Sequence, residues 1–297
     1  MPETIAQPVE YTWEHRLSTA RFAIVHLVCL GAIWTGVSLR AALLAVALYA
    51  LRMFAVTAGY HRYFSHRAYK MGRVTRFIMG FLAQSTGQKS VLWWASMHRH
   101  HHRFSDKPQD VHSPTRGFWW SHVGWILSPT TRETRFEYIK DLSSAPELMW
   151  LHRWQYTPAI VLAALCLAFA GPSGLIVGFF WSTVALYHAT FTINSLSHVF
   201  GSQRYDTGDL SRNNLWLALL TFGEGWHNNH HHYQLSVRQG FHWWEVDLTY
   251  YALCAMEKVG LVWDMRRPPQ HVVEGTAHPA APPRGEDAAP ASVPTVA

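Results

Sequence analysis

This chain of 297 residues has few cysteines, few charged residues and no basic clusters. These absences exclude several classes of protein. Cys29, Cys166 and Cys254 lie far apart among apolar neighbours, so they predict neither a disulfide framework nor a CxxC site. No cluster of five or six Lys and Arg occurs, which argues against nucleic acid as a partner although the net charge is +6.

Motifs for bound electron carriers are also missing. The sequence has no GxGxxG loop after a strand, no haem-type HPGG and no cysteine cluster for an iron–sulfur centre. If the protein carries out redox chemistry, we therefore expect its electrons to come from a separate donor.

Long apolar runs are present, and they predict membrane spans. No Lys, Arg, Asp or Glu occurs from Phe22 to Leu39, and only Arg52 interrupts the run from Ala41 to Tyr60. A span needs about 20 apolar residues. A second pair of runs is divided by the turn signal at residues 171–174. We expect an all-α fold with four transmembrane helices in two hairpins, near 20–39, 41–60, 156–170 and 174–196. The alternative for the second pair is two buried helices of a soluble bundle.

The distribution of charge predicts which side of the membrane the rest of the chain occupies. Residues 61–155 carry more than twice as many basic as acidic residues, whereas the short outer turns expose only Arg40. The positive-inside rule places such a segment in the cytoplasm. We therefore expect a membrane domain over 19–266 whose helical cap, 61–155 and 197–266, is cytoplasmic, as are both termini. Residues 1–18 are polar without a signal-peptide pattern, and the tail 267–297 is expected to be disordered.

The sequence is unusually rich in histidine, with 20 residues of this type. Most of them fall in four short segments, HRYFSH (61–66), HRHHH (98–102), NSLSH (194–198) and HNNHHH (227–232). His100 and His102 and their neighbours could form a chance basic patch, but four such segments in one chain indicate a metal site. Imidazole suits Fe, Zn, Cu and Ni, so the residue type alone does not identify the metal.

Helical geometry divides the histidines into two groups. Residues four apart lie one turn apart on the same face, so His98 and His102 can share a metal while His101 turns toward a second one. The pair His227 and His231, with a histidine to its side, repeats this arrangement. His61 and its partner five residues later would diverge on a straight helix, unless the helix ends nearby or the metal lies between two turns. The pattern predicts two metals held between helices.

HRYFSH, HRHHHRFSD, NSLSH and GEGWHNNHHHY resemble the histidine boxes of membrane fatty acyl desaturases of the stearoyl-CoA (acyl-CoA delta-9) type, in a bacterial-like form. The segment GFWWSHVGWIL between them is similar too, and the likeness spans about residues 20–265. The resemblance implies an enzyme that reduces O2 to water at two iron ions and places a cis double bond, at delta-9, in a long-chain fatty acyl thioester or lipid. It also implies two sets of ligands. One iron would take His61, His66, His98, His102 and His230, and the other His101, His198, His227 and His231, with Asn194 holding a water.

Three departures from the animal enzymes concern the carrier of the acyl chain. An Arg-Asp pair that helps to hold CoA is replaced by Ser96 and Met97, and an Arg-Lys pair by Pro129 and Thr130. A Trp of the family is Phe191 here. The carrier could therefore be CoA, a carrier protein or a glycerolipid.

Further residues are predicted to serve the same site. Aromatic side chains near the histidines are expected to line an apolar tunnel for the acyl chain: Trp93, Trp94, Trp119, Trp120 and Phe191. The alternative for them is anchoring at the membrane interface. Four carboxylates are expected to orient the imidazoles, with ordinary surface charge as the alternative: Asp106, Asp110, Asp209 and Glu224. The implied partners are the bilayer and an electron donor such as a ferredoxin or cytochrome b5 with an NAD(P)H reductase.

Two other functions compete with desaturation. A membrane di-iron hydroxylase would use the same scaffold and release an alcohol instead of an alkene. A histidine-rich zinc or nickel transporter would need no O2 and would place polar residues within several spans.

Overall fold

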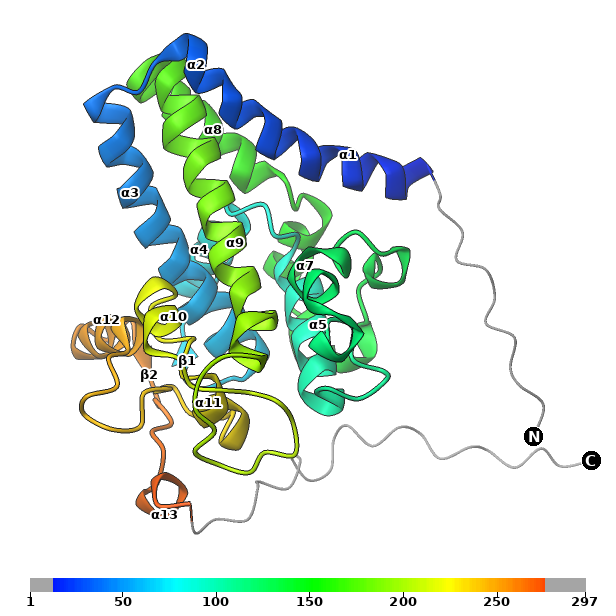
Figure 1. Cartoon of the computed structure of the whole chain (residues 1–297). Coiled ribbons are helices and arrows are strands. Elements are labelled where there is room, and N and C mark those ends of the chain that lie inside the picture. Colours follow the sequence, from blue (N-terminus) through cyan, green and yellow to red (C-terminus); the bar gives the residue numbers. More distant parts are fainter. Residues whose placement is uncertain (1–12, 276–297) are drawn as a thin grey trace, which may run out of the picture.

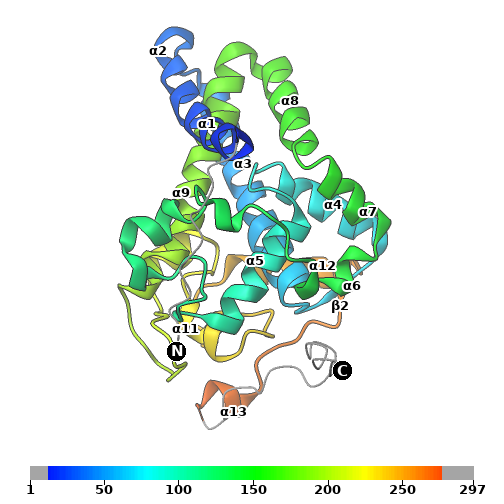
Figure 2. The same ribbon diagram turned by 90° about the vertical axis from the view of Figure 1, so that its right-hand side faces the viewer.

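The computed structural model describes residues 13–275, and helices dominate it (Figures 1 and 2). Within that range one small antiparallel sheet pairs β1 (Lys70–Met71) with β2 (Val262–Trp263). The predominantly helical class predicted from the apolar runs is therefore confirmed.

The long apolar helices stand together in the upper half of Figure 1. They are α1 (Trp13–Val28), which runs through a short 3-10 turn into α2 (Ala32–Thr35), α3 (Leu39–Phe54), α8 (Thr157–Ser173) and α9 (Ser182–Asn194). Within residues 13–275, three segments are long and apolar enough to cross a membrane: Arg16–Thr35, Leu39–Ser65 and Thr157–His198. Apolar side chains such as Val46, 70% exposed, cover their outer faces, as expected for a lipid-facing surface.

The third of these segments is bent in its middle. Ala170 and Gly171 leave the helical conformation, with φ of +63° at the glycine, and Pro172 follows. Beyond the bend Gly174 packs so closely on Cys166 that an added Cβ would lie 2.3 Å from the Cys166 carbonyl oxygen. The bend lies near the end of α8, before the π-helix Gly174–Trp181 that leads into α9, and it falls where the turn signal predicted a break.

Arg52, the one charge in the run from Ala41 to Tyr60, is buried between α3 and α9. Its guanidinium donates to Thr183 Oγ1 at 2.8 Å and to the Phe179 carbonyl at 3.4 Å. A charge inside a span must find polar partners within the protein, and here those partners join two of the apolar helices.

Shorter helices gather below this group, and two of them carry many of the histidines. They are α4 (Arg73–Gln84), α5 (Val91–Phe104), α6 (Lys140–Ser143), α7 (Pro146–Arg153), α10 (Leu215–Leu220), α11 (His227–His232) and α12 (Leu248–Lys258). Side chains of Ser90, Asn214 and Asp247 cap α5, α10 and α12 by accepting from backbone N–H groups of the first turn. The main core lies between the π-helix Ala55–Ser65, which continues α3, and α4, α5 and α7.

The order of the chain extends beyond residue 266, where the disordered tail was expected to begin. A short helix, α13 (Gln270–Val273), buries Val272 against Tyr205 and Phe241, and the Tyr205 hydroxyl donates to the Val273 carbonyl at 2.7 Å. The apolar contact comes from Val272 and Val273. The proline-rich composition of the tail gave no indication of it. The remaining parts of the two terminal segments, 1–12 and 276–297, lie outside the described residues.

Candidate metal centre

His61 lies on a π-helix, a conformation that the sequence analysis did not anticipate, and His66 directly follows it. Residues 55–65 form this element, whose hydrogen bonds join residues five apart. The His66 N–H donates to the His61 carbonyl at 3.2 Å, and the two rings lie 4.9 Å apart. A spacing of five residues, which would diverge on an α-helix, therefore brings both imidazoles to one side.

Four elements bring the histidines together at the lower ends of the long helices. The other contributors are α5, α11 and the 3-10 turn Leu196–His198, which follows α9. The side chains form two clusters, each with its ligand-type nitrogens within 4.8 Å of one another. Cluster A is His61, His66, His98, His102 and His230, and cluster B is His101, His198, His227 and His231. This is the division expected from helical angles and from the family resemblance.

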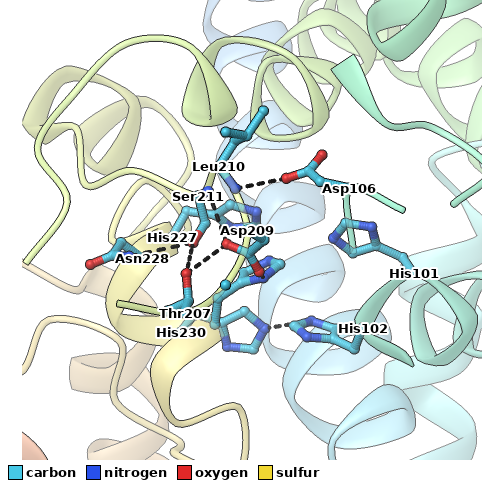
Figure 3. Close-up of polar contacts among 12 residues, drawn as sticks. His101, His102, Asp106, Thr207, Asp209, Leu210, Ser211, His227, Asn228 and His230 are labelled. Carbon is cyan, nitrogen blue, oxygen red and sulfur yellow. Dashed lines mark hydrogen bonds and ion pairs between the residues drawn. The ribbon is translucent and has the colours of Figure 1, made fainter. Parts of the chain in front are cut away.

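Carboxylates fix the orientation of the rings in cluster B. Figure 3 shows two of them, Asp106 and Asp209, in the same region as His101 and His227. Three imidazoles place Nδ1 against an aspartate: His101 against Asp110 (3.0 Å), His198 against Asp106 (3.0 Å) and His231 against Asp209 (2.6 Å). An ionised carboxylate only accepts hydrogen bonds, so each Nδ1 carries the proton and each Nε2 keeps a lone pair. Three lone pairs thus converge in one buried place.

Two of these inward nitrogens have no hydrogen-bond partner. They are Nε2 of His101 and of His231, both buried. An unpaired buried nitrogen costs free energy unless something else binds it. A metal ion is the partner that fits a set of bare imidazole nitrogens.

Cluster A shows the same convergence in another form. Its Nε2 atoms follow one another at 2.7 Å (His66 to His98), 3.0 Å (His98 to His102), 2.9 Å (His102 to His230) and 3.0 Å (His230 to His61). A nitrogen carries at most one proton, and the three middle nitrogens of this series each face two others, so hydrogen bonds cannot satisfy every contact. Lone pairs directed at a shared cation explain the geometry better.

Burial keeps these imidazoles neutral. Burial, with repulsion from neighbouring imidazoles, lowers the pKa of His66, His98, His102 and His230 well below the usual value. The rings therefore offer lone pairs at neutral pH.

The carboxylates stay ionised for a different reason. Burial alone would raise the pKa of Asp110 and Asp209, but the imidazoles beside them outweigh it and hold both pKa values below the usual range. An ionised carboxylate beside Nδ1 leaves Nε2 of the same ring for a metal, which is the arrangement that a histidine metal site requires.

The fourth predicted carboxylate, Glu224, contacts Nδ1 of His61 in cluster A. Arg62, next to that histidine, lies between Glu224 (3.0 Å) and Asp247 (2.9 Å), and Gln239 donates to Glu224 at 3.1 Å. The sequence analysis missed these supporting residues. An arginine inside the HRYFSH motif was the available signal, because a buried charge needs carboxylate partners.

An apolar cavity of 320 Å³ leads away from the histidines. His98 and Asn194 line one part of it, and Phe179 and Thr183 line another, further along the long helices. Its volume is in the range of small-molecule pockets. Of the five aromatic residues predicted for a tunnel, three line this cavity: Trp93, Trp94 and Phe191.

The other two predicted tunnel residues lie elsewhere, and this part of the prediction needs correction. Trp119 is 74% exposed. The Trp120 indole donates to the Val111 carbonyl at 3.2 Å, and the Arg116 guanidinium lies over its ring at 3.5 Å. Trp120 packs behind the cavity wall, against the cluster that includes Trp93 and Trp125, and neither tryptophan lines the cavity.

Comparison with known proteins identifies the family. The sequence model of the fatty acid desaturases matches residues 12–265. This chain belongs to the fatty acid desaturase family. It is 38% identical over 248 residues to an acyl-CoA 5-desaturase of Anemone leveillei, covering 82% of this chain and 77% of the relative.

Other relatives differ in the carrier that their names state. An sn-1 stearoyl-lipid 9-desaturase of Synechocystis sp. is 37% identical over 75% of this chain and 70% of its own length. A hex-5-enoyl-[acyl-carrier protein] acetylenase of Moorena producens is 36% identical over 78% of each chain. Family membership makes this protein an oxidoreductase of fatty acyl chains.

Two histidines of the boxes stand outside both clusters of the desaturase. His100 contacts the Gln109 carbonyl at 2.9 Å and the Tyr138 hydroxyl at 3.2 Å, and His232 stacks on Tyr205 with ring centroids 3.9 Å apart. These are the two positions that the resemblance assigned to no metal. His112, by contrast, packs against His101 at 4.2 Å.

Proposed function

We propose that this desaturase inserts a double bond into a long-chain fatty acyl group at a di-iron centre held by the nine histidines of clusters A and B. The observation that carries the proposal is the convergence of bare imidazole nitrogens whose opposite nitrogens face carboxylates. Two iron ions bound there would supply, with O2 and two electrons from a donor, the oxidation of unactivated C–H bonds that no side chain can perform.

The chain's own residues would position the reacting methylenes. The cavity beside His98 is lined mainly by apolar side chains, which suit an acyl chain, and a bound chain would be held beside the histidines. Within its wall, Trp94 Nε1 donates to Gln88 at 3.3 Å, and Gln88 in turn donates to Thr190 at 3.3 Å. These bonds join the start of α5 to α9 where the cavity passes the histidines. Asn194, which lines the cavity there, is proposed to hold a water at cluster B.

The finer assignments extend the same proposal. The proposed double bond is cis and at delta-9, and relatives named sn-1 stearoyl-lipid 9-desaturase, which are 37% identical, support the position. The proposed topology has four spans near 20–39, 41–60, 156–170 and 174–196, within a domain over 19–266 whose cap faces the cytoplasm. A thioester or a lipid carries the acyl chain, and a ferredoxin or cytochrome b5 with its reductase supplies electrons.

Expression in a host, followed by mass spectrometry of total fatty acids, tests the function directly. We expect a new monounsaturated fatty acid and about two iron ions per purified chain, the number that two separate donor clusters predict. Alcohols in place of alkenes would identify a hydroxylase. A variable zinc or nickel load without O2 consumption would contradict the proposal.

Replacing Asp209 by asparagine should weaken metal binding. The new amide oxygen can still accept from Thr207 and Ser211, but its NH2 group would then face the Nδ1–H of His231. Two opposed donors force the ring to turn or to move its proton to Nε2, the nitrogen needed for the metal. We expect affinity for iron to fall roughly 10- to 100-fold, the typical effect of losing such an outer partner.

Metal analysis after equilibration with limiting iron measures this loss. Asp206→Asn is the matched control, because Asp206 is exposed three residues away and accepts from the Gly208 N–H. Equal iron contents in the two variants would show that the Asp209 contact does not support the site.

Replacing Ala159 by phenylalanine should shorten the acyl chains that the enzyme accepts. Ala159 lines the cavity on α8, on the part formed with Phe179 and Thr183. A phenyl ring there removes space, and overfilling a packed apolar site typically costs about 1–3 kcal/mol. The ratio of short to long unsaturated products should rise by roughly tenfold or more.

Competition between acyl substrates of different length provides the measurement. Ala164→Phe adds the same ring on the same helix, but on an exposed face, and should leave the ratio unchanged. A shift of equal size in both variants would indicate a general effect on the helix.

A further inference from the structure

Three histidines outside both clusters form a hydrogen-bonded series across the long helices. His26 on α1 faces His188 on α9 with their Nε2 atoms 3.2 Å apart, and His188 Nδ1 lies 3.1 Å from His122 Nε2. His122 belongs to the short π-helix Trp120–Gly124, and its Nδ1 lies 3.0 Å from the Ser195 hydroxyl. We call these four residues the histidine chain.

The histidine chain differs from a metal site in its geometry. His188 uses both ring nitrogens, Nε2 toward one neighbour and Nδ1 toward the other. The two nitrogens lie on different sides of the ring, and a metal ligand offers one of them. In clusters A and B, by contrast, nitrogens from all members converge.

One backbone carbonyl sets the direction of the hydrogen bonds among the three histidines of the histidine chain. His26 Nδ1 lies 2.8 Å from the Phe22 carbonyl oxygen, which can only accept, so that nitrogen carries the proton. His26 Nε2 must then accept from His188, and His188 Nδ1 must accept from His122. Neutral rings thus satisfy the contacts among the three histidines. At the far end, His122 Nδ1 and the Phe191 carbonyl, 2.9 Å from Ser195 Oγ, compete for the one proton of the Ser195 hydroxyl. Because the series ends on a carbonyl, it offers no onward route for a proton, and its role is to join the elements that it connects.

The histidine chain connects α1, a weakly packed helix, to the end of α9 beside the metal centre. No described side chain of α1 is buried, yet Phe22 and Val25 of α1 line the acyl cavity. Phe22 stacks on Tyr187 with centroids 6.1 Å apart, and both belong to the cavity wall.

The other end of the histidine chain lies close to the metal centre. His122 and His188 each lie 5.8 Å from the ring of Phe191, on the cavity wall. Ser195 directly follows Asn194 and lies three residues before His198 of cluster B. The histidine chain therefore lies behind the aromatic residues that line the cavity, Phe22, Tyr187 and Phe191, and extends from α1 to the metal centre.

We propose that His26, His188 and His122 are positioning residues that fix the α1 wall of the acyl cavity relative to the metal centre. The inference rests on the proposed function, since it assigns the cavity to the acyl chain. The rigid wall determines which pair of methylenes lies beside the histidines, and so where the double bond forms. Loosening it lets the acyl chain shift along the cavity.

Substitution of His188 tests the proposal with two independent measurements. His188→Leu removes both hydrogen bonds while keeping an apolar side chain in the helix, whereas His188→Gln can still donate and accept. One measurement is the distribution of double-bond positions in the product. The other is the labelling rate of Cys29, three residues after His26, by N-ethylmaleimide in membranes of a C166A/C254A background.

We expect His188→Leu to raise both the share of displaced double bonds and the labelling rate by roughly threefold to tenfold, the effect of one or two neutral hydrogen bonds. His188→Gln should restore most of each. His26→Leu should have the same effect as His188→Leu. The double variant should displace the double bond and raise the labelling rate no more than either single variant, because each substitution already interrupts the histidine chain. His242→Leu, which removes a histidine stacked on Trp244 far along the sequence, is the control.

Two outcomes would overturn the inference. One is an unchanged product distribution and labelling rate in both leucine variants. The other is a double variant, His26→Leu with His188→Leu, whose effect equals the sum of the two single effects. Such additivity would show that the two histidines act independently. If the unsubstituted protein forms no alkene, the proposed function fails, and the inference about double-bond position fails with it, whatever the labelling shows.

Discussion

Replacing His231 by alanine is expected to eliminate desaturation and to reduce the iron bound to the protein. His231 contributes a buried Nε2 without a hydrogen-bond partner to cluster B, and its Nδ1 is fixed by Asp209 at 2.6 Å. Alanine removes the ligand and leaves Oδ2 of Asp209 without its imidazole partner. Losing an outer partner typically costs about 10- to 100-fold, so the loss of a ligand should exceed about 100-fold in product formation.

The neighbouring histidine provides a stringent control for this experiment. His232 follows directly in the sequence and on the same helix, but it stacks on Tyr205 and belongs to neither cluster. His232→Ala should keep its iron and most of its activity, with a modest loss of stability from the missing ring. Equal activities in the two alanine variants, measured as unsaturated product per mole of purified protein, would contradict the assignment of cluster B.

Much of the candidate site follows from the sequence because helical spacing is local. His98 and His102 are one turn apart on any α-helix, and the side position of His101 follows from the same geometry. Both clusters of the structure keep this division. The four carboxylates could be proposed as partners because imidazoles in such sites need acceptors on their second nitrogen, and each of them lies against one.

Contacts between segments far apart in the sequence could not be derived in this way. The π-helix at His61 depends on the core around it, since no local rule favours hydrogen bonds between residues five apart over ordinary helix. The outward placement of Trp119 depends on a turn and on Arg116 and Val111 near its neighbour Trp120. The order of Val272 depends on Tyr205, about 70 positions earlier.

The Arg62 network shows most clearly how distant residues hold the site. The side chain is 1% exposed, and it donates to Asp247 at 2.9 Å, to Glu224 at 3.0 Å and to the Val237 carbonyl at 2.8 Å. Glu224 contacts the imidazole of His61, and Asp247 caps α12 through the Tyr250 N–H at 2.9 Å. One guanidinium therefore connects cluster A to the segments that follow cluster B in the sequence.

Replacing Arg62 by methionine is expected to destabilise the whole protein, with loss of activity as a consequence. Methionine fills similar space but leaves two buried carboxylates without their cation, and breaking such a pair typically costs about 3–5 kcal/mol. Native proteins are stable by only about 5–15 kcal/mol, so this is a large share. Thermal unfolding in detergent, followed by loss of soluble monomer, should show a clearly lower midpoint and a poor yield from membranes.

The control for this variant is Arg67, an exposed arginine just after the π-helix that carries Arg62. Arg67, 56% exposed, pairs with Asp141, and exposed pairs contribute about 0–1 kcal/mol, so Arg67→Met should unfold near the parent midpoint. A partial rescue would strengthen the argument, because Asp247→Asn added to Arg62→Met removes one of the two unpaired charges. If Arg62→Met unfolded at the parent temperature and kept its iron, the buried network would not be what holds His61 in place.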